Sequence, residues 1–472
     1  MFFLTGFLGF SSGSIVIEFP SSLNPKIQDG VVVTGNAAVD SLNTALGAVH
    51  YEYYDLSWTS RLKYVIVLHF DSSRVFDVEK EVNSYSQATS GLGARVEFIQ
   101  NPEIESIPGE YLYSENIYHP EDTLWKLYSD GDDKRNWMIN SRLQYQNSAG
   151  IWMHNSAVSD LYEVFWGPLN PVVVDEFLRP FPYHWAYHAH SSLWHHLDEY
   201  NNTYKAWDYS EGEQTLAICL DPDGYWTQHP DLMDRWLPGY PQYSNDGLTP
   251  PAGTTPSNYK EWYKYKYHGT NCVGAMAASK QSLTESELTN LSSVGVAPQT
   301  SVIGRDHSVF GCLTYLHNNP ELQPVVLNAS YLIDHSNTLQ NAFEELIDMG
   351  VTIVKSRGYG DYPSTSCKYG NILEGFINVG DYRPDYRVKT KNNADSLNYY
   401  YEDYYKVEIN APGWDVWVPN VYHTYESGFT QVGYALAMGT NTSIAAPQVG
   451  GVVCLIKSLY PWMTPAEVER QI

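Results

Sequence analysis

Positive charge is scarce in this sequence. Its 472 residues include 28 Lys and Arg against 54 Asp and Glu, so the formal net charge is −26. A surface with this excess of negative charge repels a phosphate backbone, which argues against a nucleic-acid partner. The same balance favours solubility and affinity for cations or basic partners.

Cysteine is also rare. The five cysteines are Cys219, Cys272, Cys312, Cys367 and Cys454. They lie far apart, unlike the cysteines of a disulfide scaffold or of a structural zinc site. Several stand inside apolar runs, where cysteine usually packs as a small hydrophobic residue. The sequence therefore leaves the redox compartment open.

Long apolar runs and an N-terminal targeting signal are lacking as well. No stretch of 18 apolar residues occurs, so the sequence predicts no transmembrane segment. The apolar start, residues 1–10, is followed by no Lys or Arg until Lys26, so it lacks the basic region of a secretory signal peptide. The 39 tyrosines and 14 tryptophans suit extended aromatic surfaces and favour an extracellular or virion-associated location.

The first half of the chain has the weaker pattern, although the length fits two or three domains. Residues 1–60 carry Gly, Ser, Asn and Pro between short apolar segments, which predicts an irregular or β segment. Residues 61–190 form an accessory or propeptide-like region. It begins with a strand at 64–70, a helix at 75–85 and a strand at 94–99, a βαβ unit.

A group of histidines stands among Tyr and Trp residues further along this region. It contains His184, His188, His190, His195 and His196. Spacings of two and four residues could suit a metal, but no cysteine lies nearby and no alternation places the side chains on one face. A packed aromatic segment is the better interpretation.

The second half, residues 191–472, has the pattern of an α/β domain. The apolar run at 215–220 predicts a strand buried on both faces of a parallel sheet, and it ends at Asp221. Catalytic and ligand-binding groups gather at the carboxyl ends of such strands. A strand at 324–330, a helix at 338–349 and a strand at 351–354 predict a right-handed crossover.

Near the C-terminus a polar loop leads into Ser443, then small residues, Pro447 and a pair of glycines. This pattern predicts that Ser443 lies at the N-terminus of a buried helix, where the helix dipole favours negative charge. Gly450 and Gly451 would each cost about 1 kcal/mol in a helix relative to Ala, which indicates that another element packs very close. Taken alone, Ser443 could equally be a helix cap.

Asp221, His268 and Ser443 offer a carboxylate, an imidazole and a hydroxyl in that chain order. The small residues after His268 predict a tightly packed helix with His268 at its start. A serine hydroxyl is a weak nucleophile unless a neighbouring imidazole accepts its proton, and the imidazole needs a carboxylate to fix its tautomer. The three residues are therefore candidates for a nucleophilic triad.

Several segments in this order resemble the motifs of the subtilisin-like serine proteases, the subtilases. The motifs are TLAICLD at 215–221, HPDL at 229–232, HGTNCVGAMAAS at 268–279, GVAP at 295–298, APG at 411–413 and TSIAAP at 442–447. The resemblance covers residues 203–472, and Cys272 makes the histidine motif similar to the kexin and proteinase K branches.

The resemblance implies a fold and an activity. The fold is a three-layer α/β sandwich with a mostly parallel sheet, and the activity is hydrolysis of peptide bonds through an acyl-enzyme. Ser443 would be the nucleophile, His268 the general base and then acid, and Asp221 the orienting carboxylate. The substrate would be a polypeptide, and no cofactor is required for this chemistry.

Some residues depart from the family pattern. Tyr359 takes the place of the oxyanion-hole asparagine, and loss of one such donor costs about 10²–10³ in turnover, a figure measured in subtilisin itself. Gln448 replaces a histidine, and the substrate-binding strand at 330–333 reads SYLI instead of SLGG, which would narrow or reshape the site. Asp231 matches a family position that often binds structural calcium.

The sequence leaves alternatives open for the activity, for the role of the unit at residues 64–99 and for the short C-terminal end. The protein is an active serine endopeptidase, or a subtilase-fold structural or binding protein of a viral particle or surface assembly with weak or no protease activity. The unit at 64–99 resembles a subtilase propeptide in outline, or is an unrelated accessory domain. Only 29 residues follow Ser443, which predicts a fragment, a processed form or a shortened variant.

Overall fold

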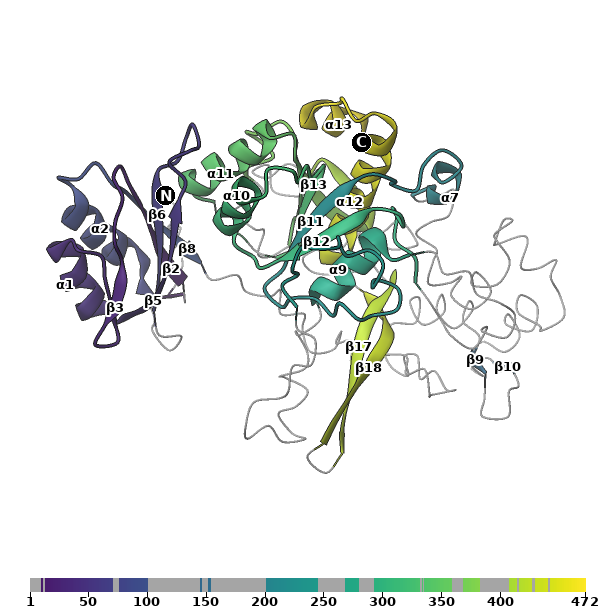
Figure 1. Ribbon diagram of the computed structural model, residues 1–472, viewed down its shortest axis with the longest axis horizontal. Coiled ribbons are helices and arrows are strands. Elements are labelled where there is room, and N and C mark those ends of the chain that lie inside the picture. The colour runs from purple at the N-terminus through teal and green to yellow at the C-terminus, as the bar shows by residue number, and fades with distance from the viewer. Residues whose placement is uncertain are drawn as a thin grey trace, which may run out of the picture.

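Two β-sheets organise the part of the chain that the structure describes (Figure 1). The histidine group near residue 190 and Tyr359 lie outside this part, so the expectations for them stay predictions. The computed structural model describes residues 10–11, 13–70, 76–100, 145–146, 152–153, 201–244, 268–279, 293–331, 333, 335–358, 368–382, 407–413, 416–426, 429–439 and 442–472.

The larger sheet has six strands and belongs to the second half of the chain. Every neighbouring pair in it is parallel, and the strands expected near 215, 326 and 352 are confirmed. The strand order across the sheet is β12 (Ser301–Arg305), β11 (Leu216–Leu220), β13 (Val326–Ala329), β14 (Thr352–Ser356), β15 (Phe376–Tyr382) and β16 (Ile409–Pro412).

Helices cover both faces of this sheet. They are α7 (Thr203–Ala206), α9 (His268–Ala277), α10 (Val309–Asn318), α11 (Asn337–Asp348), α12 (Thr442–Leu459) and α13 (Pro465–Gln471). Side chains alternate between the faces of a strand, so Ala217 packs toward α9 and α12 while Ile218 packs toward α10 and α11. The expected three-layer α/β sandwich is confirmed.

The two glycines of α12 lie where another element approaches closely, as expected from the sequence. A Cβ at Gly451 would stand 2.6 Å from the Val296 Cβ and 3.1 Å from the Met276 carbonyl oxygen. A Cβ at Gly450 would meet the Met276 sulfur at 3.2 Å. The helix that begins next to Ser443 therefore packs directly on α9 and on the segment around Val296.

These two glycines give a matched pair of substitutions. Gly451→Ala should lower the free energy of unfolding by about 2 kcal/mol, because Val296 is β-branched and the Met276 carbonyl is backbone, so neither can move aside cheaply. Gly450→Ala should cost little, since the flexible Met276 side chain can move and alanine gains about 1 kcal/mol of helix propensity. Urea denaturation of both variants measures the difference, and equal losses would contradict this account.

Helix α12 is also long and apolar enough to cross a membrane by composition alone. It has 18 residues and a mean hydropathy of 1.3, but 78% of it is buried inside the fold. Within the described ranges it is the one helix with this property. Its burial is that of a core helix.

The smaller sheet has four antiparallel strands in the order β5 (Ala48–Asp55), β6 (Tyr64–Phe70), β2 (Gly13–Phe19) and β8 (Arg95–Gln100). With α1 (Ala37–Leu46) and α2 (Val78–Thr89), the chain order is β-α-β-β-α-β, a split βαβ arrangement. The strands expected at 64–70 and 94–99 and the helix after residue 75 are confirmed, although the helix begins at Val78.

Two expectations for the first 60 residues need correction. The segment contains helix α1, which begins after Asn36, whose side chain accepts from the amides of Ala38 and Val39, and ends at Gly47 with φ 72°. The expected division at residue 60 falls inside the four-stranded sheet, because β2 and β5 pair with β6 across it. The region that we call the N-terminal unit is therefore residues 13–100.

The N-terminal unit packs on α10 and α11 and shares one apolar core with the larger sheet. Val65 and Val67 of β6 belong to the same buried cluster as Phe310 of α10. At the edge of this contact, the Glu97 carboxylate accepts hydrogen bonds from the amides of Asn337 (3.1 Å) and Thr338 (3.0 Å). These amides open α11, where the helix dipole favours a negative charge.

The remaining strands form two-stranded antiparallel sheets. They pair β1 (Phe10–Ser11) with β7 (Phe76–Asp77), β3 (Lys26–Gln28) with β4 (Val31–Val33), β9 (Tyr145–Gln146) with β10 (Trp152–Met153), and β17 (Val416–Glu426) with β18 (Phe429–Gly439).

Candidate active site

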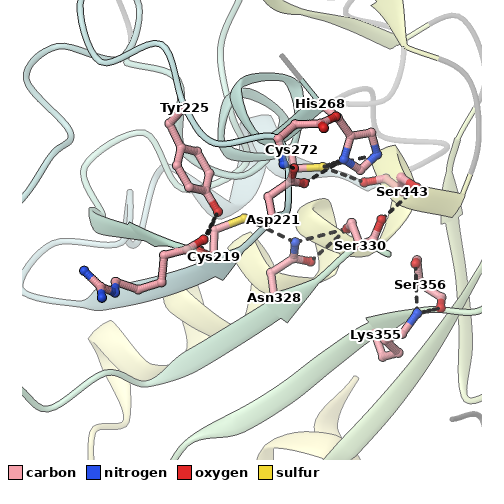
Figure 2. A network of polar contacts seen from close by, with 12 residues as sticks. Cys219, Asp221, Tyr225, His268, Cys272, Asn328, Ser330, Lys355, Ser356 and Ser443 are labelled. Atoms are coloured by element: carbon pink, nitrogen blue, oxygen red, sulfur yellow. Dashed lines mark hydrogen bonds and ion pairs between the residues drawn. The ribbon is translucent and has the colours of Figure 1, made fainter. Parts of the chain in front are cut away.

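The carboxylate and the imidazole expected from the sequence meet at the carboxyl edge of the larger sheet (Figure 2). Asp221 directly follows β11, and His268 is the first residue of α9. His268 Nδ1 lies 2.6 Å from Asp221 Oδ2. The carboxylate is wholly buried, and the His268 side chain is 12% exposed. This pair fixes the ring so that Nε2 is the nitrogen left for another partner.

Close backbone packing holds the two residues together. A Cβ at Gly269 would lie 2.5 Å from the Gly224 carbonyl oxygen and 3.0 Å from the Asp221 Cβ, so the position requires glycine. The Thr270 hydroxyl accepts from the Trp226 amide at 2.9 Å. The start of α9 is thus tied to the loop that follows Asp221.

Ser443 lies at the N-terminus of α12, beside the same pair. It is wholly buried, and its hydroxyl donates to the Ser330 carbonyl oxygen at 3.1 Å. Its own carbonyl oxygen accepts from the Cys272 thiol at 3.4 Å (Figure 2). A hydrogen bond between Ser443 and His268 stays a prediction.

Cys272 lies one helical turn after His268, and its sulfur contacts both the His268 ring and the Ser443 carbonyl oxygen. Its sulfur lies 3.8 Å from His268 Nδ1 and 4.0 Å from Nε2. Burial raises the pKa of the Cys272 thiol, although the nearby His268 opposes this rise. The thiol is therefore neutral near pH 7, and it packs under the imidazole as a small polar group.

The protonation of His268 follows from this environment. Burial alone would lower the pKa of His268, but negative charge at Cys272 and Asp221 and their hydrogen bonds outweigh burial and raise it well above its usual value. Since the Cys272 thiol is neutral near pH 7, the Asp221 carboxylate is the negative charge that opposes the effect of burial there. The site is suited to hold a proton on the imidazole during a reaction.

Asp221, His268 and Cys272 also form the one candidate metal group among the described ranges, since their ligand atoms lie within 4.8 Å of one another. A metal there would have to replace the hydrogen bond between Asp221 and His268. The arrangement is better suited to holding the imidazole than to holding a metal.

Asp231, the expected calcium position, has a different environment. Its Oδ2 accepts from the Ser293 amide (2.9 Å) and hydroxyl (3.2 Å), and burial raises its pKa to about 7. Calcium takes six to eight oxygen ligands, whereas in the described part of the chain Asp231 belongs to no candidate metal group. A calcium ion at Asp231 stays a prediction.

Tyr331, Ile333 and Gln448, which also depart from the family pattern, are buried inside the fold. Tyr331 and Ile333 are buried in the apolar core on the α10 side of the sheet. The Gln448 amide donates to the carbonyl oxygens of Pro412 and Ile444 and accepts from Asn201, so it links α12 to the end of β16. Neither substitution introduces an unpaired polar group into the site.

Sequence reasoning missed one residue that shapes the site. Asn328 of β13 is wholly buried, and its amide donates to the Ser330 hydroxyl at 3.1 Å and to the Cys219 sulfur at 3.5 Å (Figure 2). It thereby orients Ser330, whose carbonyl receives the Ser443 hydroxyl. An asparagine inside the apolar run 325–329 was the available signal.

Comparisons with known proteins cover the half of the chain that holds these residues. Residues 213–472 match the sequence model described as the subtilase family. An extracellular protease of Xanthomonas campestris pv. campestris is 26% identical over 297 residues, which cover 57% of this chain and 48% of that protein. Subtilisin-like protease 1 of Plasmodium berghei is 25% identical over 295 residues, covering 54% of this chain and 45% of that protein.

The chain thus spans about half the length of these relatives. Among solved structures, one that is similar is fervidolysin from Fervidobacterium pennivorans, a keratinolytic enzyme related to subtilisin. It is 16% identical with a TM-score of 0.48, over 99% of this chain and 57% of that chain.

Proposed function

Because the chain belongs to the subtilase family, we propose that it is a serine endopeptidase in which Asp221, His268 and Ser443 form the catalytic triad. The observation that carries the proposal is the 2.6 Å contact between His268 Nδ1 and the buried Asp221 carboxylate, beside Ser443 at the start of α12. This contact leaves His268 Nε2 to accept a proton.

The reaction begins with the Ser443 hydroxyl. It turns from the Ser330 carbonyl oxygen toward His268 Nε2 and attacks the carbonyl carbon of a peptide bond, while the imidazole takes its proton. His268 then gives this proton to the leaving nitrogen, and the acyl group stays on Ser443 as an ester. A water molecule attacks the ester, again with His268 as base, and restores the hydroxyl.

The negative oxygen of each tetrahedral intermediate needs donors. The Ser443 amide is one, because it belongs to the first turn of α12, where backbone N–H groups have no intrahelical acceptor. Thr442 links this turn to the residue before Tyr359, since its hydroxyl oxygen accepts from the Gly358 amide at 3.2 Å. We propose the Tyr359 hydroxyl as the second donor.

The Tyr359→Phe variant tests the second donor. Removal of the hydroxyl should lower kcat by about 10²-fold with little change in KM, because an oxyanion donor acts in the transition state and not on the bound substrate. Steady-state kinetics on a peptide substrate measures both constants. If Tyr359→Phe keeps the full rate, the hydroxyl is not an oxyanion donor.

A fluorophosphonate probe tests the proposed activity itself. The probe should label the chain at Ser443, because an activated serine attacks its phosphorus and a plain helix cap does not. Ser443→Ala should abolish labelling, whereas Ser458→Ala, at the other end of α12, should not. Absence of labelling in the folded protein, both in the unchanged chain and in the Glu97→Lys variant described below, would support the structural or binding alternative.

The alternative of a structural protein in a viral particle or surface assembly gains no support from the Xanthomonas and Plasmodium relatives, both of which are described as proteases. The Xanthomonas relative is named an extracellular protease, which agrees with the extracellular location expected from the sequence.

We further propose that the N-terminal unit acts as a propeptide-like inhibitor. Its split βαβ fold and its broad contact with α10 and α11 support this role. Glu97→Lys places a positive charge at the N-terminus of α11, where it weakens docking. If the unit inhibits, this variant should be labelled by the probe several-fold faster than the unchanged chain, whereas an unrelated accessory domain would leave the rate unaltered.

A further inference from the structure

The hairpin formed by β17 and β18 is long and regular. Its two 11-residue strands pair in continuous register from Val416 opposite Gly439 to Glu426 opposite Phe429. At about 3.4 Å per residue, each strand is roughly 37 Å long. Figure 1 shows this ribbon projecting away from the larger sheet, beyond α9.

The base of the ribbon is fixed to the catalytic helices. The Asn271 side-chain amide donates to the Pro419 carbonyl oxygen at 2.5 Å, and a Cβ at Gly274 would stand 2.0 Å from the Pro419 Cδ. Val416 and Val418 are buried with residues of α9 and α12. Strand β18 ends at Gly439, four residues before Ser443, so the ribbon extends directly from the site.

The edges of the ribbon lack the usual protection. Within the described residues neither β17 nor β18 pairs with a third strand, so each presents a row of backbone donors and acceptors on its outer side. Proteins normally guard long edge strands with lysines, prolines, bulges or a covering element, and here the proline, Pro419, lies only at the anchored base of β17. Residues 416–439 contain no Lys or Arg, and their register has no break. The backbone groups of such an edge can form hydrogen bonds with an extended polypeptide.

The position of the ribbon indicates which part of a polypeptide it would meet. His268 must reach the nitrogen of the leaving group in order to protonate it, so the leaving group lies on the α9 side of Ser443. The ribbon is anchored on α9 through Asn271 and Gly274, on this same side. A substrate segment that leaves the site past His268 therefore runs toward the ribbon.

The charge of the ribbon indicates which kind of polypeptide segment it can bind. The chain as a whole carries a net charge of −26, which repels acidic and attracts basic segments, but Glu426 is the one Asp, Glu, Lys or Arg among residues 416–439, so the ribbon itself offers almost no charge to either kind. An uncharged, extended segment can lie along this part of the molecule without a large electrostatic penalty.

We propose that the β17–β18 ribbon is a second binding surface for the polypeptide substrate, one that pairs with an uncharged, extended segment on the leaving-group side of the scissile bond. This inference rests on the proposed function. Main-chain hydrogen bonds along one edge would supply the affinity, as in other cases of strand addition. The protein would then prefer unfolded chains to short peptides.

A shortened hairpin tests the proposal. Replacement of residues 421–434 by Asn-Gly joins Asn420 to its partner Ala435 through a two-residue turn and keeps the anchored base. In a full-length Ser443→Ala background, binding of a fluorescein-labelled uncharged peptide, with about ten residues beyond the scissile bond, is measured by anisotropy. Shortening should weaken binding tenfold or more, because several main-chain hydrogen bonds are lost. Equal affinity would overturn the proposal, whether or not the protein hydrolyses peptides.

A second measurement needs no hairpin variant. For the unchanged protein, kcat/KM should rise as residues are added on the leaving-group side, up to about the length of one strand. A short thioester without such residues gives the reference rate, which the shortened hairpin should leave unaltered. A flat length series with full thioester activity would overturn the proposal alone. Loss of thioester activity and of probe labelling, with hairpin-dependent peptide binding kept, would overturn the proposed function instead.

Discussion

Replacement of His268 by alanine should remove hydrolysis, with a loss in kcat of roughly 10⁶-fold, a figure measured in subtilisin itself. The loss is this large because the imidazole acts in every step: it activates the hydroxyl, protonates the leaving nitrogen and activates water. Hydrolysis of a chromogenic peptide measures the effect.

His317→Ala is the matched control, because His317 lies on the exposed side of α10. It should leave kcat unchanged. The double variant with Ser443→Ala should be no worse than His268→Ala alone, because the two residues act as a unit. Unchanged turnover in His268→Ala would refute the assignment of the general base.

Asp221→Asn should lower kcat by about 10⁴-fold, the loss found for this change in another triad protease. The carboxylate lies 2.6 Å from His268 Nδ1 and is wholly buried, so no water can replace it. An asparagine amide can donate to Nδ1 and hold the wrong tautomer, in which Nε2 carries the proton and cannot accept one.

The same variant should change the pH dependence in a defined direction. Burial lowers the pKa of His268, and the Asp221 carboxylate is one of the groups that raise it above its usual value. Catalysis needs the neutral imidazole, so kcat of the unchanged protein increases as pH rises through this raised value. Without the carboxylate the pKa falls, and the residual activity of Asp221→Asn should begin at lower pH. Asp208→Asn, which removes an exposed carboxylate, is the control, and an unshifted profile in Asp221→Asn would contradict the role of Asp221.

The larger sheet was predictable because its strands have a pattern that few other structures share. The continuous apolar run before Asp221 indicates burial on both faces, and the paired glycines of α12 indicate close packing. Both features depend on local composition. The pairing of Asp221 with His268 could be predicted only from the family resemblance, since 47 residues separate them in the sequence.

Other elements depend on contacts that a local pattern does not show. Helix α1 has weakly apolar residues, and its capping residues Asn36 and Gly47 resemble ordinary turn residues until the helix is seen between them. Strand β2 pairs with β8 more than 70 residues later, so the N-terminal sheet had no local signature beyond its last three elements. Asn328 is visible only as a polar residue in an apolar strand.

The apolar core that Val65 and Val67 share with α10 determines how the two halves of the molecule behave if the connecting chain is cut. Separation would bring the buried faces of both halves into contact with water, at about 25 cal/mol for each Å² uncovered. A single proteolytic cut between residues 100 and 201 should therefore yield two fragments on a denaturing gel that still elute from a sizing column as one particle.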